Sequence, residues 1–289
     1  MLFRSCYYFF YLKAKIIIGV CKIAGKDFHG KRYTLKLFLS GGLIAIFLGF
    51  YYSQFAEMYQ FKSLELMLIL AYGNLYIEEI VFIVPVFLWM VPLIVIIFFL
   101  GDYIHRNFDQ NAAYIFTRTA RRSLWLIGQA VNLFLYILIY YIFQIAAFCV
   151  VSTVLGFSMF SWDVGIMLIV SELALLVLSN YMIVLLINVL SLFKLNSLFC
   201  VAITLTTNIV CIFLSAILYK FYTKNIAIIK WLPFTQGILT WHSGISSVAD
   251  FFPFNIPHFS ILFSIVYLII ICLLLLFCGV CKIEKMDIY

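Results

Sequence analysis

The sequence predicts an all-α polytopic membrane protein with six transmembrane helices, and two features of its composition lead to this fold class. Of its 289 residues, 66% are hydrophobic and only 11% are charged, against roughly 25% charged residues in an ordinary soluble domain. With 31 Phe and 19 Tyr the chain is far from a disordered composition, so its apolar mass must face lipid. At about 20 residues per span, no sizeable soluble domain fits, and we treat 1–289 as a single transmembrane domain.

Each predicted span is an apolar run long enough to cross the roughly 30 Å hydrocarbon core at about 1.5 Å per residue. An even number of spans places both termini on the same side of the membrane. Most of the Lys and Arg residues flank the runs on that side, in the first 36 residues, in the connection 102–125 and around Lys194 and Lys282. The positive-inside rule makes this side cytoplasmic. The runs lie at 35–53, 80–101, 126–155, 164–190, 198–219 and 259–281.

Two segments outside the spans are too apolar or too basic for ordinary loops. The N-terminal segment 1–34 alternates aromatic residues with lysines, which favours an amphipathic helix in the cytoplasmic interface over a poorly ordered basic tail. The extracellular connection 220–258 holds short hydrophobic pieces broken by Pro and Gly. Such pieces predict re-entrant or interfacial half-helices before the sixth span, because backbone at membrane depth must be buried in protein or line a cavity.

The sequence offers little for catalysis, for metal binding or for nucleic acid. Its four His and twelve acidic residues are spread widely, so we predict no catalytic residue and no metal site. Cys278-Gly-Val-Cys281 has the CxxC spacing but lacks a second pair for zinc. Glu78-Glu79 matches the start of an intramembrane protease motif, but Ile83 occupies the position of the motif's arginine. We therefore interpret the pair as the solvent-exposed end of a loop. The basic residues flank hydrophobic runs instead of forming a solvated patch, which excludes a nucleic-acid partner.

Three residues form a candidate substrate path. Glu172 is the only acid well inside a predicted span, and an intramembrane carboxyl indicates a functional site by default. The alternative is a neutral, hydrogen-bonded Glu172 that holds helices together through an amide side chain such as Asn132, and both interpretations stay open. Trp241, in the last extracellular connection, completes the candidate path.

Small residues recur every four positions in the first span, at Gly41, Ala45 and Gly49. Such a stripe lets two helix backbones approach closely. It could pack within the monomer, which we favour, or between subunits.

The connection 102–125 predicts a short cytoplasmic helix with a basic face. Arg118, Arg121 and Arg122 are spaced i, i+3 and i+4 and share that face. One interpretation is that these arginines only anchor the membrane edge, which explains the charge but not the order of the neighbouring residues.

That order resembles the first cytoplasmic loop of the permease subunits of type-2 ABC exporters. Asp109 takes the acid position, Ile115-Phe116-Thr117 the hydrophobic stretch with its Thr, Arg122 the arginine, and Gly128-Gln129 the pair that opens the third span. The sequence departs from the pattern at three positions, with Ala113 for Thr, Thr119 for Pro and Gln129 for Lys. The aromatic character is similar to permeases that export, or confer immunity to, bacteriocins, lantibiotics and phenol-soluble modulins.

The resemblance implies a transport subunit of a bacterial cytoplasmic membrane that is not itself an enzyme and needs no cofactor of its own. ATP and Mg would be bound by a separate ABC ATPase, present in two copies, and a second permease copy or paralogue would complete the assembly in the lipid. The cargo would be an amphipathic or hydrophobic substrate, most simply a peptide. The helix at 103–122 would be the coupling helix, contacting the ATPase through Asp109, Tyr114, Phe116, Arg118, Arg121 and Arg122.

Two other functions compete with this one. The chain could be an ATPase-independent immunity or sensor protein that sequesters a peptide in its last extracellular connection. Less favoured is an intramembrane enzyme that uses Glu172 or Glu78-Glu79.

Overall fold

The computed structural model describes residues 30–58, 62–77, 83–118, 122–159, 162–193, 195–221, 228–243, 252 and 254–286, without the side chains of 31–34, 57–58 and 111–118. Met1–Lys36 and Leu37–Tyr289 are two separate compact units, and the packing below lies within the second. Most of the predicted interfacial segment 1–34, together with Glu78-Glu79 and Arg121, lies outside the described residues. The first described helix begins at Gly30, ahead of the predicted start of the first span at 35.

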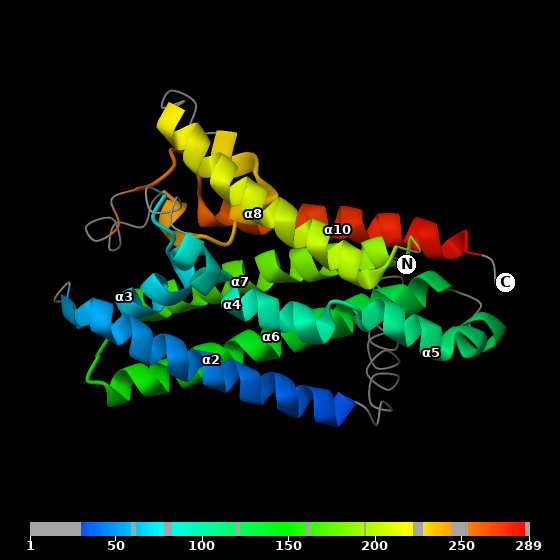
Figure 1. The fold of residues 1–289 in the computed structure, drawn as a ribbon, viewed down its shortest axis with the longest axis horizontal. Helices are drawn as coiled ribbons and strands as arrows, with labels where there is room; N and C mark the ends of the chain where they lie inside the picture. Colours follow the sequence, from blue (N-terminus) through cyan, green and yellow to red (C-terminus); the bar gives the residue numbers. More distant parts are fainter. Residues whose placement is uncertain are drawn as a thin grey trace, which may run out of the picture. The chain divides into compact units, whose positions relative to one another are not determined.

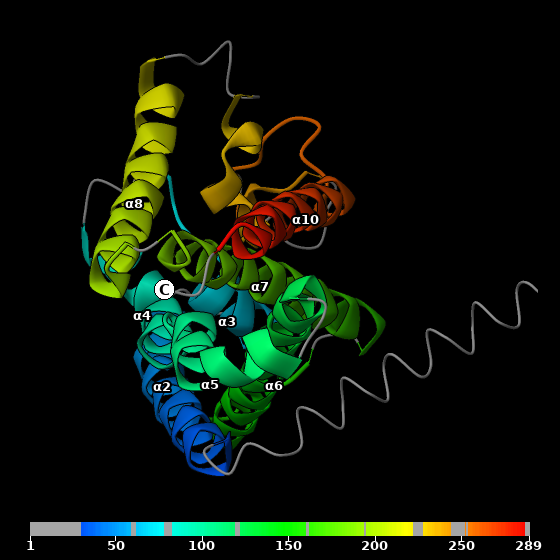
Figure 2. The ribbon, with the colours of Figure 1, turned by 90° about the vertical axis from the view of Figure 1, so that its right-hand side faces the viewer.

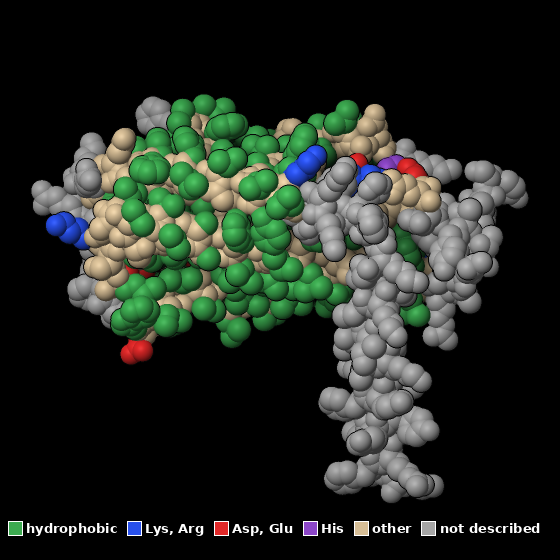
Figure 3. Space-filling model, turned by 90° about the horizontal axis from the view of Figure 1, so that it is seen from below, with side chains coloured by type: hydrophobic (Ala, Val, Ile, Leu, Met, Phe, Trp, Pro, Cys, Tyr) green, Lys and Arg blue, Asp and Glu red, His purple; other side chains and the backbone are tan. Residues whose placement is uncertain are grey.

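The described residues contain six helices that are long and apolar enough to cross a membrane, and each coincides with one of the predicted runs. The fold class is confirmed at this level, and the chain is a multi-pass membrane protein. Hydrophobic side chains cover the middle of the face seen in Figure 3, and charged side chains lie toward its two ends. The six helices are α2 (Gly30–Met58), α4 (Ile83–Leu100), α6 (Arg122–Val154), α7 (Trp162–Ser191), α8 (Ser197–Phe221) and α10 (Ile261–Glu284).

Helix α7 is the central helix of the second unit. The protein buries 72% of its most apolar stretch, against 17% to 39% in the other five spans. Helices α6, α8 and α10 all pack on it, and the end-on view in Figure 2 shows α7 between α6 and α10. A helix that is apolar all round is typical of such a buried position.

The small-residue stripe of α2 faces α6. A methyl group added at Gly41 would lie 3.0 Å from Tyr140 Cε2, and one added at Gly49 would lie 2.7 Å from Val151 Cγ1. Ala45, between them, is fully buried. Within one chain, two helices seen side by side in Figure 1 are thus packed with the small residues of α2 against side chains of α6.

Between α2 and α4, in the connection between the first two predicted spans, the structure contains a buried element. The short helix α3 (Leu64–Leu68) continues into one turn of π-helix, η1 (Ile69–Gly73). Helix α3 packs against α6 and α7, and η1 packs against α7. All ten residues are buried, including Glu65 at 5% exposure. The run is too short to span a membrane, so its apolar surface is covered by protein instead.

The described part of the connection before α10 is compact. Residues 228–243 include two short 3-10 helices, η4 (Pro233–Thr235) and η5 (Leu239–Trp241), instead of longer α-helical pieces. Pro233 suits the first turn of η4 because its fixed φ matches the helix and the missing N–H would be unpaired there anyway. Element η5 packs against η1 and α7, and η4 packs against α7 and α8. We call residues 62–77 and 228–243 together the cap.

Candidate functional site

Two regions concentrate polar side chains in an otherwise apolar protein. One is the junction between α4 and the next helix, α5 (Tyr103–Arg118), which the sequence predicted as the coupling helix. The other is the buried floor of the cap. We describe the α4–α5 junction first.

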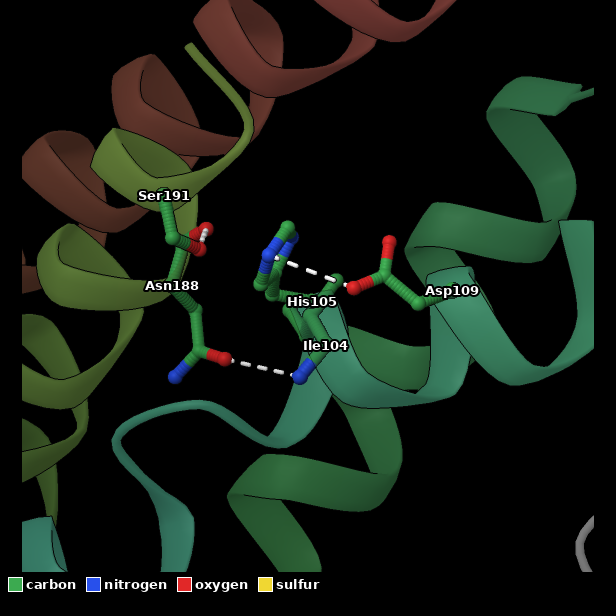
Figure 4. A network of polar contacts seen from close by, with 5 residues as sticks. All are labelled: Ile104, His105, Asp109, Asn188 and Ser191. Carbon is green, nitrogen blue, oxygen red and sulfur yellow. Dashed lines mark hydrogen bonds and ion pairs between the residues drawn. The ribbon is translucent and has the colours of Figure 1, made fainter. Parts of the chain in front are cut away.

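Asn188 of α7 bridges the junction between α4 and α5. Its Oδ1 accepts a hydrogen bond of 2.7 Å from the Ile104 backbone N–H, and its Nδ2 donates one of 2.9 Å to the Leu100 carbonyl. Figure 4 shows the Asn188 side chain pointing at the start of α5. One buried amide therefore pairs with the backbone carbonyl of the last residue of α4 and the backbone N–H of the second residue of α5. Both partners lie more than 80 positions away in the sequence.

The turn between the two helices depends on Gly101. Its N–H donates to the Ile97 carbonyl at 2.8 Å, and a methyl group at this position would lie 2.6 Å from that same carbonyl oxygen. A side chain is thus excluded where the chain leaves α4 and enters α5.

Helix α5 is also tied to α6. The Asn107 side chain donates to Gln129 Oε1 at 2.9 Å, and the rings of Phe108 and Trp125 lie 6.0 Å apart. These contacts, with those of Asn188, attach α5 to two membrane-spanning helices.

The predicted coupling residues do not share one environment in the structure. Asp109 is exposed and lies 3.4 Å from His105 Nε2, one helical turn away, as Figure 4 shows. Arg122 points back into the protein and donates to the Met286 carbonyl at 2.7 Å. Tyr114, Phe116 and Arg118 lie on α5, but their side chains are outside the described part. Of the three arginines of the predicted basic face, only Arg122 has a described side chain, and it binds the segment after α10.

The two segments of the cap are joined by hydrogen bonds to each other and to α4. Trp241 Nε1 donates to the Leu75 carbonyl at 2.8 Å, and Thr240 Oγ1 donates to Asn74 Oδ1 at 3.1 Å. Trp89 of α4 donates to the Tyr72 carbonyl, also at 2.8 Å. Trp241 is 1% exposed, so its indole holds the cap together instead of lining an open path.

A chain of hydrogen bonds attaches the cap to α10. Gln236 Nε2 donates to the Lys230 and Leu232 carbonyls, which fixes the orientation of its amide, and Ser264 Oγ donates to Gln236 Oε1 at 2.7 Å. His242 Nε2 lies 2.7 Å from the same hydroxyl, and its Nδ1 lies 2.9 Å from the Ile238 carbonyl. Both ring nitrogens therefore face oxygens that can accept a hydrogen bond. A neutral imidazole carries only one N–H, so one of these two contacts lacks a proton while His242 is neutral. Burial nevertheless lowers the pKa of His242 to about 4.

Glu172 lies beneath the cap. Its side chain is fully buried, and neither carboxyl oxygen has a hydrogen-bond partner among the described residues. A methyl group added at Gly73 would overlap Glu172 Oε2, and Leu239 of η5 reaches the same place. Gly73 and Leu239 therefore cover the carboxyl from the two segments of the cap.

Other buried polar atoms near Glu172 also lack partners. Tyr141 of α6 is close to Glu172, to Tyr140 and to Tyr72 of η1, and Gln144 faces Tyr72. The hydroxyls of Tyr72 and Tyr140 and both amide atoms of Gln144 have no hydrogen-bond partner in the described structure. Such a group of unpaired atoms in a protein interior calls for an explanation.

The predicted substrate path is only partly brought together. Trp241 and Glu172 both belong to the cap region, but Asn132 lies half-buried on α6, about 13 Å along the helix axis from Tyr141. The sequence analysis did not single out Gly73, Tyr72 or His242. It also did not identify Asn188, although an amide near the end of an apolar run indicates a buried polar group that needs a hydrogen-bond partner.

The described residues contain no group of three or more His, Cys, Asp or Glu side chains that could hold a metal ion. Cys278 and Cys281 lie near the end of α10, the first exposed and the second half-buried.

Comparison with known protein families places the chain in one of them. The profile described as "Protein of unknown function (DUF2705)" matches residues 42–289. The chain belongs to the DUF2705 family. No curated protein and no solved structure matches it. The DUF2705 match begins within α2, so both the α4–α5 junction and the cap lie inside the region that defines the family.

Proposed function

We propose that this DUF2705 protein is the permease subunit of an ABC transporter that exports an amphipathic or hydrophobic substrate, most simply a peptide such as a toxin, bacteriocin or lantibiotic. A separate ATPase would bind ATP and Mg, and two permeases would work with two ATPases. The observation that carries the proposal is the attachment of α5 to the central helix α7 through Asn188. The resemblance of residues 109–129 to the first cytoplasmic loop of type-2 ABC permeases supports the same assignment.

Helix α5 has the properties that force transmission requires. It is short, it follows α4 through a turn fixed by Gly101, and it is bonded to α7 by Asn188 and to α6 by Asn107. A displacement of α5 by a partner would move two spans directly, because buried hydrogen bonds and close packing resist independent motion. Asp109 is exposed on α5 and His105 is partly exposed, so both are available to a docking partner.

The decisive experiment is purification of the full chain from its native membrane in mild detergent, with a search for a nucleotide-binding chain in the complex. We expect charge reversal at Arg118 and Arg121 to reduce transport-linked ATP hydrolysis at least tenfold. Charge reversal of Lys220 is the matched control and should leave hydrolysis unchanged. Lys220 is exposed in the last turn of α8, at the opposite end of that helix from the connection to α7. If the protein with both arginines reversed still hydrolyses ATP during transport at the wild-type rate, the assignment of α5 as the coupling helix is wrong.

The exposed surface of the single chain supports the proposed class of cargo. Large hydrophobic side chains are exposed along α8 and α10, among them Leu198, Ile217 and Phe277. Faces of this kind suit lipid, a second permease copy or an amphipathic chain, and they offer nothing to a sugar or an ion. Stimulation of the ATPase by amphipathic peptides, but not by sugars, is the corresponding test.

The proposal also fixes the orientation of the chain. In a bacterial cytoplasmic membrane, α5 and both termini lie on the cytoplasmic side, and the cap lies on the outer side. A reporter fused after residue 289 should be active only in the cytoplasm. A periplasmic or surface signal would show that the chain has the opposite orientation.

An ATPase-independent immunity or sensor protein is the second candidate, and the cap favours it. Two distant segments are bonded together over a buried acid, which is also how a peptide-responsive lid would be built. In that case no ATPase would co-purify, and disruption of the cap would abolish protection while changes at Arg118 and Arg121 would not.

A further inference from the structure

The carboxyl of Glu172 is isolated from solvent and from ordinary partners. It lies about 15 Å along α7 from Trp162, is fully buried, and has no hydrogen-bond partner for either oxygen among the described residues. No ion pair in the described structure involves it. An ionised carboxylate in such a place costs several kcal/mol or more, so its charge must be neutralised.

The titratable groups around Glu172 cannot neutralise it. Tyr141 of α6 lies close to it, and Tyr140 and Tyr72 lie close to Tyr141. Glu65 of α3 lies near Gly165, about 10 Å along α7 from Glu172, and is another acid. His242 lies beyond η5 and is itself buried. Each of these groups is neutral or acidic, so none replaces a missing cation.

The packing favours a proton over a metal ion. A metal cation would need several oxygen ligands around it, yet the carboxyl is covered directly by the backbone of Gly73 and the side chain of Leu239. Gly73 leaves no space for even a methyl group beside Oε2. A proton adds almost no volume and turns the carboxyl into a neutral group.

We propose that Glu172 is a proton-binding site whose occupancy is coupled to the cap. The carboxyl holds a proton while residues 62–77 and 228–243 are closed over it. When these segments part and water enters, the O–H bond breaks, the proton passes to water, and the hydrated carboxylate remains. The inference does not rest on the proposed transport function, because it uses only the burial of Glu172 and the two segments that cover it.

The linkage between proton binding and opening of the cap determines how opening depends on pH. The closed cap binds one proton more than the open cap, so raising the pH favours opening. At neutral and alkaline pH the opening equilibrium should rise with pH, by at most about tenfold per pH unit for the release of one proton. His242 contributes little in this range, since its pKa is about 4 in the closed structure.

Infrared spectroscopy of the full chain in lipid nanodiscs tests the protonated state. We expect the carbonyl stretch of a neutral carboxylic acid at pH 7, shifted by D2O, absent from Glu172→Gln and retained in the matched control Glu65→Gln, the other buried acid. Glu172→Asp, which keeps an acid at the site, should retain a band at a changed frequency. Absence of the band from the wild type, or its survival in Glu172→Gln, overturns the proposal.

Hydrogen exchange of peptides from 62–77 and 228–243 tests the coupling. After correction for intrinsic rates, we expect opening of the wild-type cap to increase with pH and opening of Glu172→Gln to be independent of pH. Replacement of choline by Na⁺ at constant pH and ionic strength should have no effect on either. A Na⁺-dependent protection that Glu172→Gln removes, or the same pH dependence in both proteins, would falsify proton binding at this carboxyl. Loss of ATPase coupling bears only on the proposed function and leaves these outcomes unchanged.

Discussion

Asn188 accepts a 2.7 Å hydrogen bond from the backbone N–H of Ile104, and so fixes the second residue of α5 to the last turns of α7. The same amide donates to Leu100 and to Val184 of its own helix. A single side chain therefore sets the angle at which α5 leaves the membrane-spanning bundle. Because α7 is the most buried span, this attachment connects α5 to the centre of the second unit.

Replacement of Asn188 by Leu should weaken this attachment. The buried Ile104 N–H and Leu100 carbonyl would lose their partner, at a cost of roughly 1–3 kcal/mol. Asn180→Leu is the matched control, since Asn180 donates only to Leu176 within α7. Thermal unfolding and hydrogen exchange at residues 100–106 measure the difference, and equal effects of the two variants would contradict the role of Asn188.

The contact between α2 and α6 should be sensitive to one methyl group at Gly49. Gly49→Ala places Cβ 2.7 Å from Val151 Cγ1, and such overpacking costs about 1–3 kcal/mol. Gly42→Ala is the control on the same helix, because its methyl would lie 3.4 Å from the Phe143 ring, an ordinary contact. We expect Val151→Ala to rescue Gly49→Ala in thermal unfolding. Failure of this rescue would show that the two positions are not in contact.

The cap should lose stability in acid through His242. Burial lowers its pKa from 6.5 to about 4, so the unfolded segment binds the proton more readily than the folded one. The stability that neutral His242 contributes is full above about pH 6.5 and falls between there and about pH 4, by up to about 3 kcal/mol. Hydrogen exchange of residues 236–243 measures it. We expect His242→Gln to remove this part of the pH dependence, and an unchanged profile would exclude His242 as its source.

Trp241 and Trp231 should respond differently to replacement by Phe. Trp241→Phe removes the hydrogen bond to the Leu75 carbonyl in a buried site, at a cost of about 1–3 kcal/mol. Trp231 is 56% exposed, so Trp231→Phe should change stability by less than about 0.5 kcal/mol. Limited proteolysis between α3 and α4 reports the release of the cap. Equal sensitivity of the two variants to protease would contradict the assigned role of Trp241.

The six spans were predictable because run length and apolarity alone identify a membrane-spanning helix. The buried element Leu64–Gly73 was missed for the same reason. It is half the length of a span and carries Glu65, so the sequence pattern is that of a loop. Its helical form depends on burial against α6 and α7, which no local pattern encodes.

The candidate sites were less predictable than the spans. The position of α5 followed from its place between two runs, but its attachment depends on Asn188, more than 80 residues away. The isolation of Glu172 depends on Gly73 and Leu239, which come from two distant connections. Sequence identified Glu172 as exceptional and left open whether it is paired. The described structure gives it no partner.

The central place of α7 has a consequence for the order in which the protein is made. This helix carries Glu172, Asn180 and Asn188, all buried in the finished fold, yet α10, which packs extensively on it, is synthesised last. Until α8 and α10 are inserted, one side of α7 is exposed to lipid, where unpaired polar groups are costly. The partly synthesised bundle that ends at α7 is therefore less stable in the bilayer than the finished fold.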